Sequence, residues 1–384
     1  MVLGTRLALA MGALAFSAFS GTALAKASGE PIIIGMSTPL TGGAAYLGQH
    51  EKKGAELAIE QINAAGGVLG RPLKLEAEDN RCNPSEGVSS VSRLLDNSSV
   101  VGLVGAMCSS VTLALMPQVE RAKMPLLVNV STAKSISEKA GVGGNEWTFQ
   151  TNPTDQGLAV ALASYLEKKN TFKKIAVVGE DTDYGRGGAQ MLEAALKAKG
   201  IEVVSKDFFV QGTQDFNTLL TRLNSAKPDA IALYALAADQ LNFFRQYQGF
   251  GMTIPLTGRV ELSGLQSKVI RSGVIDGASS VFPYSPAVDT AENKQFVAAF
   301  KKANGEDPIY QSFAGYEAVK VVADAIARAG KADRAAVRDA LEKTNYASMM
   351  GGRIAFDDHN HAHNNAVVLE VRGDEVVVVG LYGT

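Results

Sequence analysis

Ser109 is the residue whose position most clearly offers chemistry. It follows a strand-like apolar run at residues 100–104 and begins a helix-patterned run that reaches about residue 121. Its hydroxyl therefore lies beside unpaired backbone N–H groups of the first helical turn, including that of Ser110, where the helix dipole is positive. Such a corner binds a carboxylate. Ser109 could also act only as a helix cap, and the two roles are compatible.

A histidine-rich turn offers a second kind of chemistry. His359, His361 and His363 follow Asp357 and Asp358, and alternate residues of a strand face the same way, as metal ligands must. The simpler interpretation is a solvated turn between two late strands. We favour that interpretation and predict no metal site.

Catalytic signatures are missing from the sequence. It contains no G-x-S-x-G, H-E-x-x-H, P-loop or G-x-G-x-x-G motif, and no histidine is placed in sequence as a base for Ser109. We therefore predict that the protein is not an enzyme and holds no cofactor. A periplasmic hydrolase remains the third-ranked alternative.

The first 25 residues have the pattern of an export signal. Arg6 supplies the positive charge, residues 7–19 form the apolar stretch, and Ala23-Leu24-Ala25 is a small-x-small cleavage site. This apolar stretch is too short and too interrupted to span a bilayer. No cysteine lies near the cleavage site, so we expect a freely diffusing periplasmic protein without a lipid or membrane anchor.

Cys82 and Cys108 are the only two cysteines, and an oxidising compartment favours a disulfide between them. Closing that loop should contribute about 3–4 kcal/mol in the chain-entropy model. The alternatives are a metal site, which lacks further ligands nearby, and a redox pair, which lacks the C-x-x-C spacing.

Length and composition describe an ordinary soluble protein of two domains. The 384 residues exceed one comfortable core, 46% of them are hydrophobic, and the net charge is -2. This charge gives no attraction to phosphate backbones, so nucleic acid is not an expected partner.

Strand-like and helix-like runs alternate twice along the chain, which predicts an α/β protein with two parallel sheets covered by helices. Three late helices need a place to pack, and a partly uncovered first sheet is one such place. The expected strands are residues 32–36, 73–78, 100–104 and 125–130, then 175–179, 202–209, 230–234 and 255–257. The expected late elements are helices at 290–304, 311–329 and 334–343 and strands at 353–356, 365–371 and 375–381.

The helix after the second strand has the clearest start signal. Asn83 is expected to cap it, with Pro84 in the first turn. Its buried stripe is predicted to comprise Val88, Val91 and Leu95.

Several segments resemble the leucine/isoleucine/valine-binding proteins of branched-chain amino-acid ABC importers, which are type I periplasmic binding proteins. The resemblance spans nearly the whole chain, and its most specific segments are residues 35–48, 62–70, 79–84, 105–110, 181–187 and 214–216. It implies a disulfide between the two cysteines, in agreement with the compartment argument. The expected partners are a small carboxylate ligand and ABC permease subunits, and a monomer is expected.

The same resemblance implies two Rossmann-like lobes joined by a three-segment hinge, with the ligand in the cleft between them. Lobe 1 would comprise residues 30–150 and 283–352, and lobe 2 residues 151–282 and 353–384. In open parallel sheets, ligands bind outside the carboxyl ends of the strands, which agrees with this placement.

The resemblance also implies roles for individual side chains. Val130, Ser131 and Thr132 match the family's second carboxylate-binding turn. Tyr184 matches a tyrosine that closes over the ligand from the opposite lobe. Tyr46, in the first Gly-rich loop, matches an aromatic wall.

Two segments depart from the family. Ala235-Leu236-Ala237-Ala238 replaces a tyrosine-bearing segment with an apolar surface that includes Leu236. In Gly258-Arg259-Val260-Glu261, Val260 aligns with the acid that neutralises the ligand's ammonium group, and a shift of one residue would restore Glu261.

A buried ammonium without a carboxylate would cost several kcal/mol. The departures therefore favour a small hydrophobic or aromatic carboxylic acid, to which Arg259 adds a second contact. The alternatives are aliphatic, branched-chain amino acids and a role as the ligand-binding component of a sensory system.

Overall fold

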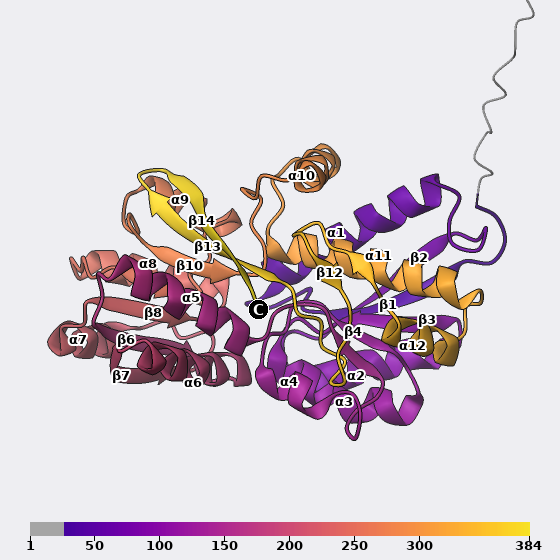
Figure 1. Cartoon of the computed structure of the whole chain (residues 1–384), viewed down its shortest axis with the longest axis horizontal. Coiled ribbons are helices and arrows are strands. Elements are labelled where there is room, and N and C mark those ends of the chain that lie inside the picture. The colour runs from indigo at the N-terminus through magenta and orange to yellow at the C-terminus, as the bar shows by residue number, and fades with distance from the viewer. Residues whose placement is uncertain (1–26) are drawn as a thin grey trace, which may run out of the picture.

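The computed structural model describes residues 27–384, which form two halves side by side (Figure 1). The predicted signal peptide, residues 1–25, lies outside the described residues. No helix of the described part combines the length and apolar character that crossing a membrane requires.

The first sheet has five parallel strands in the order β2-β1-β3-β4-β5. Its central strands β1 and β3 are buried at every residue, because helices cover both faces. The fourth strand ends earlier than predicted, at Val128, because the chain then leaves the sheet. The strands are β1 (Ile32–Thr38), β2 (Leu73–Asp79), β3 (Val100–Gly105), β4 (Leu126–Val128) and β5 (Thr148–Gln150).

Four helices of the first half connect these strands. They are α1 (Ala45–Ala64), α2 (Pro84–Asp96), α3 (Ser109–Ala122) and α4 (Lys134–Lys139). Asn83 caps α2 as predicted, because its side chain accepts the N–H groups of Ser85 and Glu86.

The predicted buried stripe of α2 is partly wrong. Val91 is fully buried, but Val88 is 38% exposed and Leu94 is buried in place of Leu95. Gly87 lies where α2 packs against α3: a side chain there would come within 2.4 Å of Val111.

The second half contains a parallel sheet of four strands in the order β7-β6-β8-β9. Its strands are β6 (Lys174–Glu180), β7 (Glu202–Phe209), β8 (Ala230–Tyr234) and β9 (Leu256–Gly258). Its helices are α5 (Asp155–Lys169), α6 (Asp183–Ala198), α7 (Asn217–Ala226), α8 (Ala237–Gly249) and the short α9 (Ser267–Arg271).

The late strands pair antiparallel rather than extending the parallel pattern. In the order β10-β13-β14 they form a separate three-stranded sheet. A tight turn after Arg372 joins β13 to β14, and such a turn connects only antiparallel neighbours. The strands are β10 (Ser279–Phe282), β13 (Asn365–Arg372) and β14 (Glu375–Gly383), and a two-stranded piece pairs β11 (Tyr346–Ala347) with β12 (Arg353–Ile354).

Three late helices return to the first half: α10 (Ala291–Asn304), α11 (Tyr310–Ala329) and α12 (Arg334–Glu342) (Figure 1). Helix α11 lies along α1, and two glycines let their backbones touch. A Cβ on Gly54 would lie 1.9 Å from the carbonyl oxygen of Ser312, and one on Gly315 would lie 2.1 Å from that of Glu51. This close contact fixes the N-terminus of α11.

The chain thus passes between the two halves three times, at residues 151–154, 283–290 and 355–364. Strands β13 and β14 carry it back to the second half, and the C-terminus lies between the halves (Figure 1). The carboxyl ends of both parallel sheets face each other across this junction.

Candidate functional site

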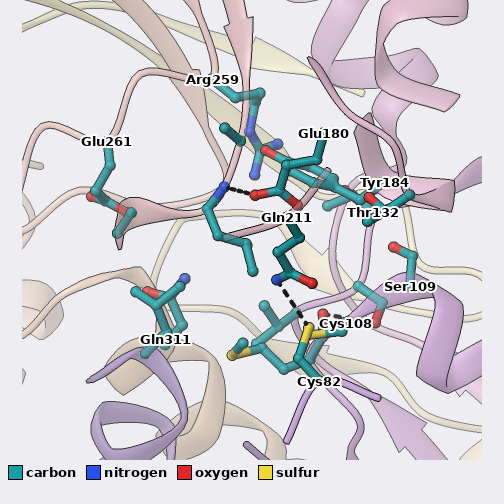
Figure 2. Close-up of a pocket in the computed structure, with 18 of the residues that line it drawn as sticks. Cys82, Cys108, Ser109, Thr132, Glu180, Tyr184, Gln211, Arg259, Glu261 and Gln311 are labelled. Carbon is teal, nitrogen blue, oxygen red and sulfur yellow. Dashed lines mark hydrogen bonds between the residues drawn. A yellow bond between two sulfur atoms is a disulfide. The ribbon is translucent and has the colours of Figure 1, made fainter. Parts of the chain in front are cut away.

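A cavity lies between the two halves, at the carboxyl ends of the parallel strands (Figure 2). Its empty space is about 710 Å³, counted to its open mouth. The lining comprises Leu47, Cys82, Met107, Cys108, Ser109, Ser110, Val130, Ser131, Thr132, Glu180, Thr182, Tyr184, Gln211, Ala235, Leu236, Ala237, Gln240, Arg259, Glu261, Phe282, Tyr310 and Gln311.

Four long helices begin at this cavity. Ser109 is the first residue of α3, Tyr184 lies in the first turn of α6, Ala237 begins α8, and Tyr310 begins α11. Each helix start presents unpaired N–H groups and the positive end of a dipole. The cavity therefore favours an anion even before any charged side chain is considered.

Hydroxyl groups from the first half line one side, which we call the hydroxyl wall: Ser109, Ser131 and Thr132. Ser109 Oγ accepts the N–H of Ala133 at 3.3 Å. Ser131 Oγ donates to the carbonyl oxygen of Met107 at 2.9 Å. These bonds hold the turn after β4 in place.

Two contacts join the halves at the cavity rim. Ser110 Oγ accepts the N–H of Asp183, at the start of α6, at 3.3 Å. Gln211 Nε2 lies 3.7 Å from Cys82 Sγ. Cys82 and Cys108 form a disulfide with their Cα atoms 5.5 Å apart, so the predicted disulfide is present and lies in the cavity lining.

Arg259 is the most unusual side chain of the cavity. It is only 3% exposed, and its Nε and Nη1 have no hydrogen-bond partner among the described residues. Its guanidinium lies over the rings of Phe282, at 4.4 Å, and Tyr184, at 5.9 Å. Since a buried N–H without an acceptor is costly, Arg259 is poised to receive an anion.

A buried carboxyl, Asp155, lies near Arg259 at the first residue of α5. Burial raises the pKa of Asp155 to about 6, against the opposing effects of Arg259 and the Thr132 hydroxyl. The backbone N–H of Asp155 donates to the Thr132 carbonyl oxygen at 2.7 Å. The hydroxyl wall is thereby linked to the start of the second half.

Glu261, rather than Val260, lines the cavity. The side chain of Val260 is fully buried and does not line the cavity. Of the two residues considered for the acidic position, Glu261 is therefore the one that faces the cavity. Glu261 accepts the hydroxyl of Ser263 at 2.5 Å, and burial raises its pKa. Arg259 and Glu261 lie in the segment directly after β9, at the carboxyl end of that strand, and both line the cavity.

Glu180 is a cavity residue that sequence reasoning missed. It ends β6, is 1% exposed, and accepts the backbone N–H of Leu236 at 2.5 Å (Figure 2). Burial raises its pKa. Its place at the carboxyl end of a parallel strand, before the cap of α6, was the available signal. Gln240, Tyr310 and Gln311 were missed as well, because they lie on helices assigned only to packing.

The structure brings together eight of the nine predicted ligand residues and leaves one aside. Ser109, Ser110, Val130, Ser131, Thr132, Tyr184, Leu236 and Arg259 all line the cavity.

Tyr46 does not line it. It belongs to the first turn of α1 rather than to a loop, and its ring lies 4.5 Å from that of His50. Its neighbour Leu47 contacts the cavity instead. Burial and the carboxylates of Glu306 and Glu261 raise the pKa of Tyr46 to about 12.

Comparison with known proteins gives consistent matches. The periplasmic binding protein family matches residues 31–375. A leucine-, isoleucine-, valine-, threonine- and alanine-binding protein of Pseudomonas aeruginosa is 27% identical over 359 residues, which are 94% of each chain.

Two solved structures share the fold. A leucine binding protein of Thermotoga maritima superposes with a TM-score of 0.81 at 26% identity, over 91% of this chain and 98% of the other. A solute binding protein of an ABC transporter from R. palustris, solved in complex with benzoate, gives a TM-score of 0.84 at 22% identity, over 92% and 98%.

Proposed function

The chain belongs to the periplasmic binding protein family, and on that premise we propose that it binds a small hydrophobic or aromatic carboxylic acid for an ABC importer. It is of the branched-chain amino-acid transporter type, whose members bind small ligands as the solute-binding component and are not enzymes. The ligand class, the permease partner, the monomeric state and export by residues 1–25 are proposals.

The observation that carries the ligand class is the buried guanidinium of Arg259, with two N–H groups that lack a partner among the described residues. A carboxylate between Arg259 and the hydroxyl wall would satisfy both groups and would also meet the N-terminus of α3. The same guanidinium opposes an ammonium group through charge repulsion. A ligand that carries a carboxylate but no ammonium group beside it therefore suits this end of the cavity.

The rest of the ligand would lie against apolar side chains. Leu47, Met107, Leu236 and Phe282 line the cavity beside its polar groups. Burying an aromatic ring there contributes roughly 25 cal/mol per Å² of apolar surface removed from water. These contacts support an apolar acid over a fully polar one.

Closure of two lobes over the ligand is the proposed mechanism. The proposed lobes are residues 30–150 with 283–352, and residues 151–282 with 353–384. Tyr184 and Arg259 would reach the ligand from one lobe, and Ser109 and Thr132 from the other. Because the ligand contacts both lobes only in the closed form, binding shifts the population toward that form.

A branched-chain amino acid is the alternative that a specific observation favours. Glu261 lines the cavity and could pair with an ammonium group. The P. aeruginosa relative is named for binding such amino acids, and the benzoate complex is evidence only that this fold accommodates an aromatic acid. A sensory component is distinguished from an importer component by whether uptake requires permease subunits.

The test is thermal unfolding of ligand-stripped protein with benzoates, arylglyoxylates and hydroxycinnamates against leucine, isoleucine and valine. A ligand at a hundredfold excess over Kd should stabilise the protein by about 2.7 kcal/mol. Benzamide, which has the ring of benzoate but no charge, is the matched control and should give no shift. Stabilisation by the amino acids alone would reject the proposal and assign the ammonium to Glu261.

A further inference from the structure

Three potential metal ligands meet in the crossing at residues 355–364, away from the cavity. One ligand atom from each of Asp357, His361 and His363 lies within 4.8 Å of the others. The turn faces an open groove beside the C-terminal end of β14. The sequence favoured a solvated turn here, but the hydrogen bonds around the two rings point to a different use.

The ring of His361 is oriented by the first crossing. Its Nε2 lies 3.1 Å from the carbonyl oxygen of Asn152, which only accepts hydrogen bonds. Nε2 therefore carries the hydrogen, and in the neutral ring Nδ1 keeps its lone pair. The side chain is 5% exposed, so packing holds this orientation.

The ring of His363 is oriented by the chain end in the same manner. Its Nδ1 lies 3.1 Å from the main-chain oxygen of Thr384, so Nδ1 carries the hydrogen. Nε2 of the neutral ring then presents a lone pair toward Asp357 Oδ2, 3.1 Å away.

Asp357 has one carboxylate oxygen left that could act as a metal ligand. Its Oδ1 accepts the backbone N–H groups of His359, at 2.9 Å, and His361, at 3.0 Å. Its Oδ2 faces Nε2 of His363. Two lone pairs that face each other at this distance repel unless a cation or a proton lies between them.

We propose that Asp357 Oδ2, His361 Nδ1 and His363 Nε2 bind a first-row divalent transition metal, with zinc as the reference ion. Two imidazoles and one carboxylate form a ligand set for such metals, whereas calcium and magnesium prefer oxygen ligands alone. Three protein ligands leave a fourth position for solvent.

The main-chain oxygens of Asn152 and Thr384 supply what metal-bound histidines usually have, an acceptor for the second ring N–H. They also belong to segments far from the histidines in sequence. A metal would therefore join the third crossing to the first crossing and to the end of β14. The site is independent of the ligand cavity and of the function proposed for it.

Equilibrium dialysis of tag-free protein against zinc chloride alone, at pH 7.5, is the direct test. One zinc per chain is expected. His363→Gln and Asp357→Asn should each weaken binding by roughly tenfold or more, since even outer-shell changes cost that much. His359→Gln and Asp358→Asn are matched controls, because they make the same chemical changes at exposed neighbours, and they should leave the affinity unchanged within twofold.

Folding is checked by the unfolding midpoint of each variant in EDTA, which should match that of the unaltered protein because both replaced side chains are exposed. Binding of less than one zinc per chain would overturn the proposal and leave a protonated His363 paired with Asp357. Equal losses in the variants and in their controls would also overturn it, because zinc would then bind diffusely to the turn.

Discussion

The two sides of the cavity are built differently. The hydroxyl wall of the first half is neutral, and Ser109 and Ser131 already make hydrogen bonds within it. The second half contributes buried ionisable groups, which we call the charged wall: Arg259, Glu180 and Glu261. Arg259 leaves two N–H groups without a partner among the described residues, while burial raises the pKa of both glutamates.

This difference separates two tasks. The hydroxyl wall is already held in place by hydrogen bonds within the protein. It fixes where an anion lies, because its geometry does not depend on the ligand. The charged wall depends on what binds to it, because a ligand would pair with these two N–H groups of Arg259 and protons neutralise its glutamates. Affinity and pH dependence should therefore arise mainly from the charged wall, and rigidity from the hydroxyl wall.

The largest expected effect concerns that rigidity. Replacing both cysteines, Cys82→Ser with Cys108→Ser, should lower the free energy of unfolding by about 3 kcal/mol, because the unfolded chain regains loop freedom. Urea unfolding followed by circular dichroism measures this loss. Unfolding of the unaltered protein in reducing agent should match the double variant, and a loss below about 1 kcal/mol would show that the disulfide adds little to the stability of the fold.

Arg259→Gln should weaken binding of the most stabilising acid of the panel by about 100-fold, because a charged partner of the carboxylate is removed. Isothermal titration calorimetry measures the affinity. Arg259→Lys should recover part of it, since the charge remains but the fork of donors is lost. Arg245→Gln, an exposed change of the same charge on α8, is the control. An unchanged affinity in Arg259→Gln would mean that the charged wall does not contact the anion.

A smaller loss is expected from the hydroxyl wall. Thr132→Val should weaken binding by about tenfold, the value of one hydrogen bond to a charged group. The matched control is Thr148→Val, because Thr148 is buried in β5, its hydroxyl has no partner among the described residues, and it does not line the cavity. A loss in Thr132→Val greater than that in Arg259→Gln would reverse the comparison.

The smallest effect concerns pH. Burial raises the folded pKa of Glu180 above its ordinary value of 4.5, so the folded state binds the proton more tightly than the unfolded chain. The stability that this group contributes is therefore present below pH 4.5 and is lost as the pH rises toward the folded pKa.

Glu180→Gln should reduce the fall in the unfolding midpoint between pH 5 and pH 8 by about 2 °C. Differential scanning calorimetry across this range measures it. Glu193→Gln, at a partly exposed surface glutamate of α6, should leave the slope unchanged. A steeper fall in Glu180→Gln would mean that the folded state favours the ionised carboxylate, contrary to the expected effect of burial.

Much of the fold was predictable because buried parallel strands carry continuous apolar runs. The predicted ranges of β7 and β8 agree with the structure to the residue. The buried face of α2 was less predictable, because Gly87 and Ser90 pack there and hydrophobic periodicity does not detect small residues. The antiparallel pairing of β10 with β13 depends on contacts between segments about 90 residues apart, as between Ser279 and Glu370.

The site was predictable where a strand leads directly into a helix, as at Ser109, since that junction is visible in the sequence. Which of Val260 and Glu261 faces the cavity was not predictable, because both lie in the irregular segment after β9, where no strand or helix period fixes the side-chain direction. Tyr46 does not line the cavity, because α1 begins one residue before it and Leu47 faces inward instead. The orientation of His363 depends on Thr384, which no local pattern indicates.

The glycine contact between α1 and α11 has a consequence for mapping this protein by mutation. Any side chain at Gly54 or Gly315 would overlap the backbone of the facing helix. In a saturation library selected for ligand-dependent growth, both positions should be depleted of every substitution, as strongly as Arg259. If intolerance to substitution were the only criterion, Gly54 and Gly315 would be assigned to the binding site although neither contacts the ligand. A parallel selection for protein abundance would separate them, since only the glycine variants should be lost from it.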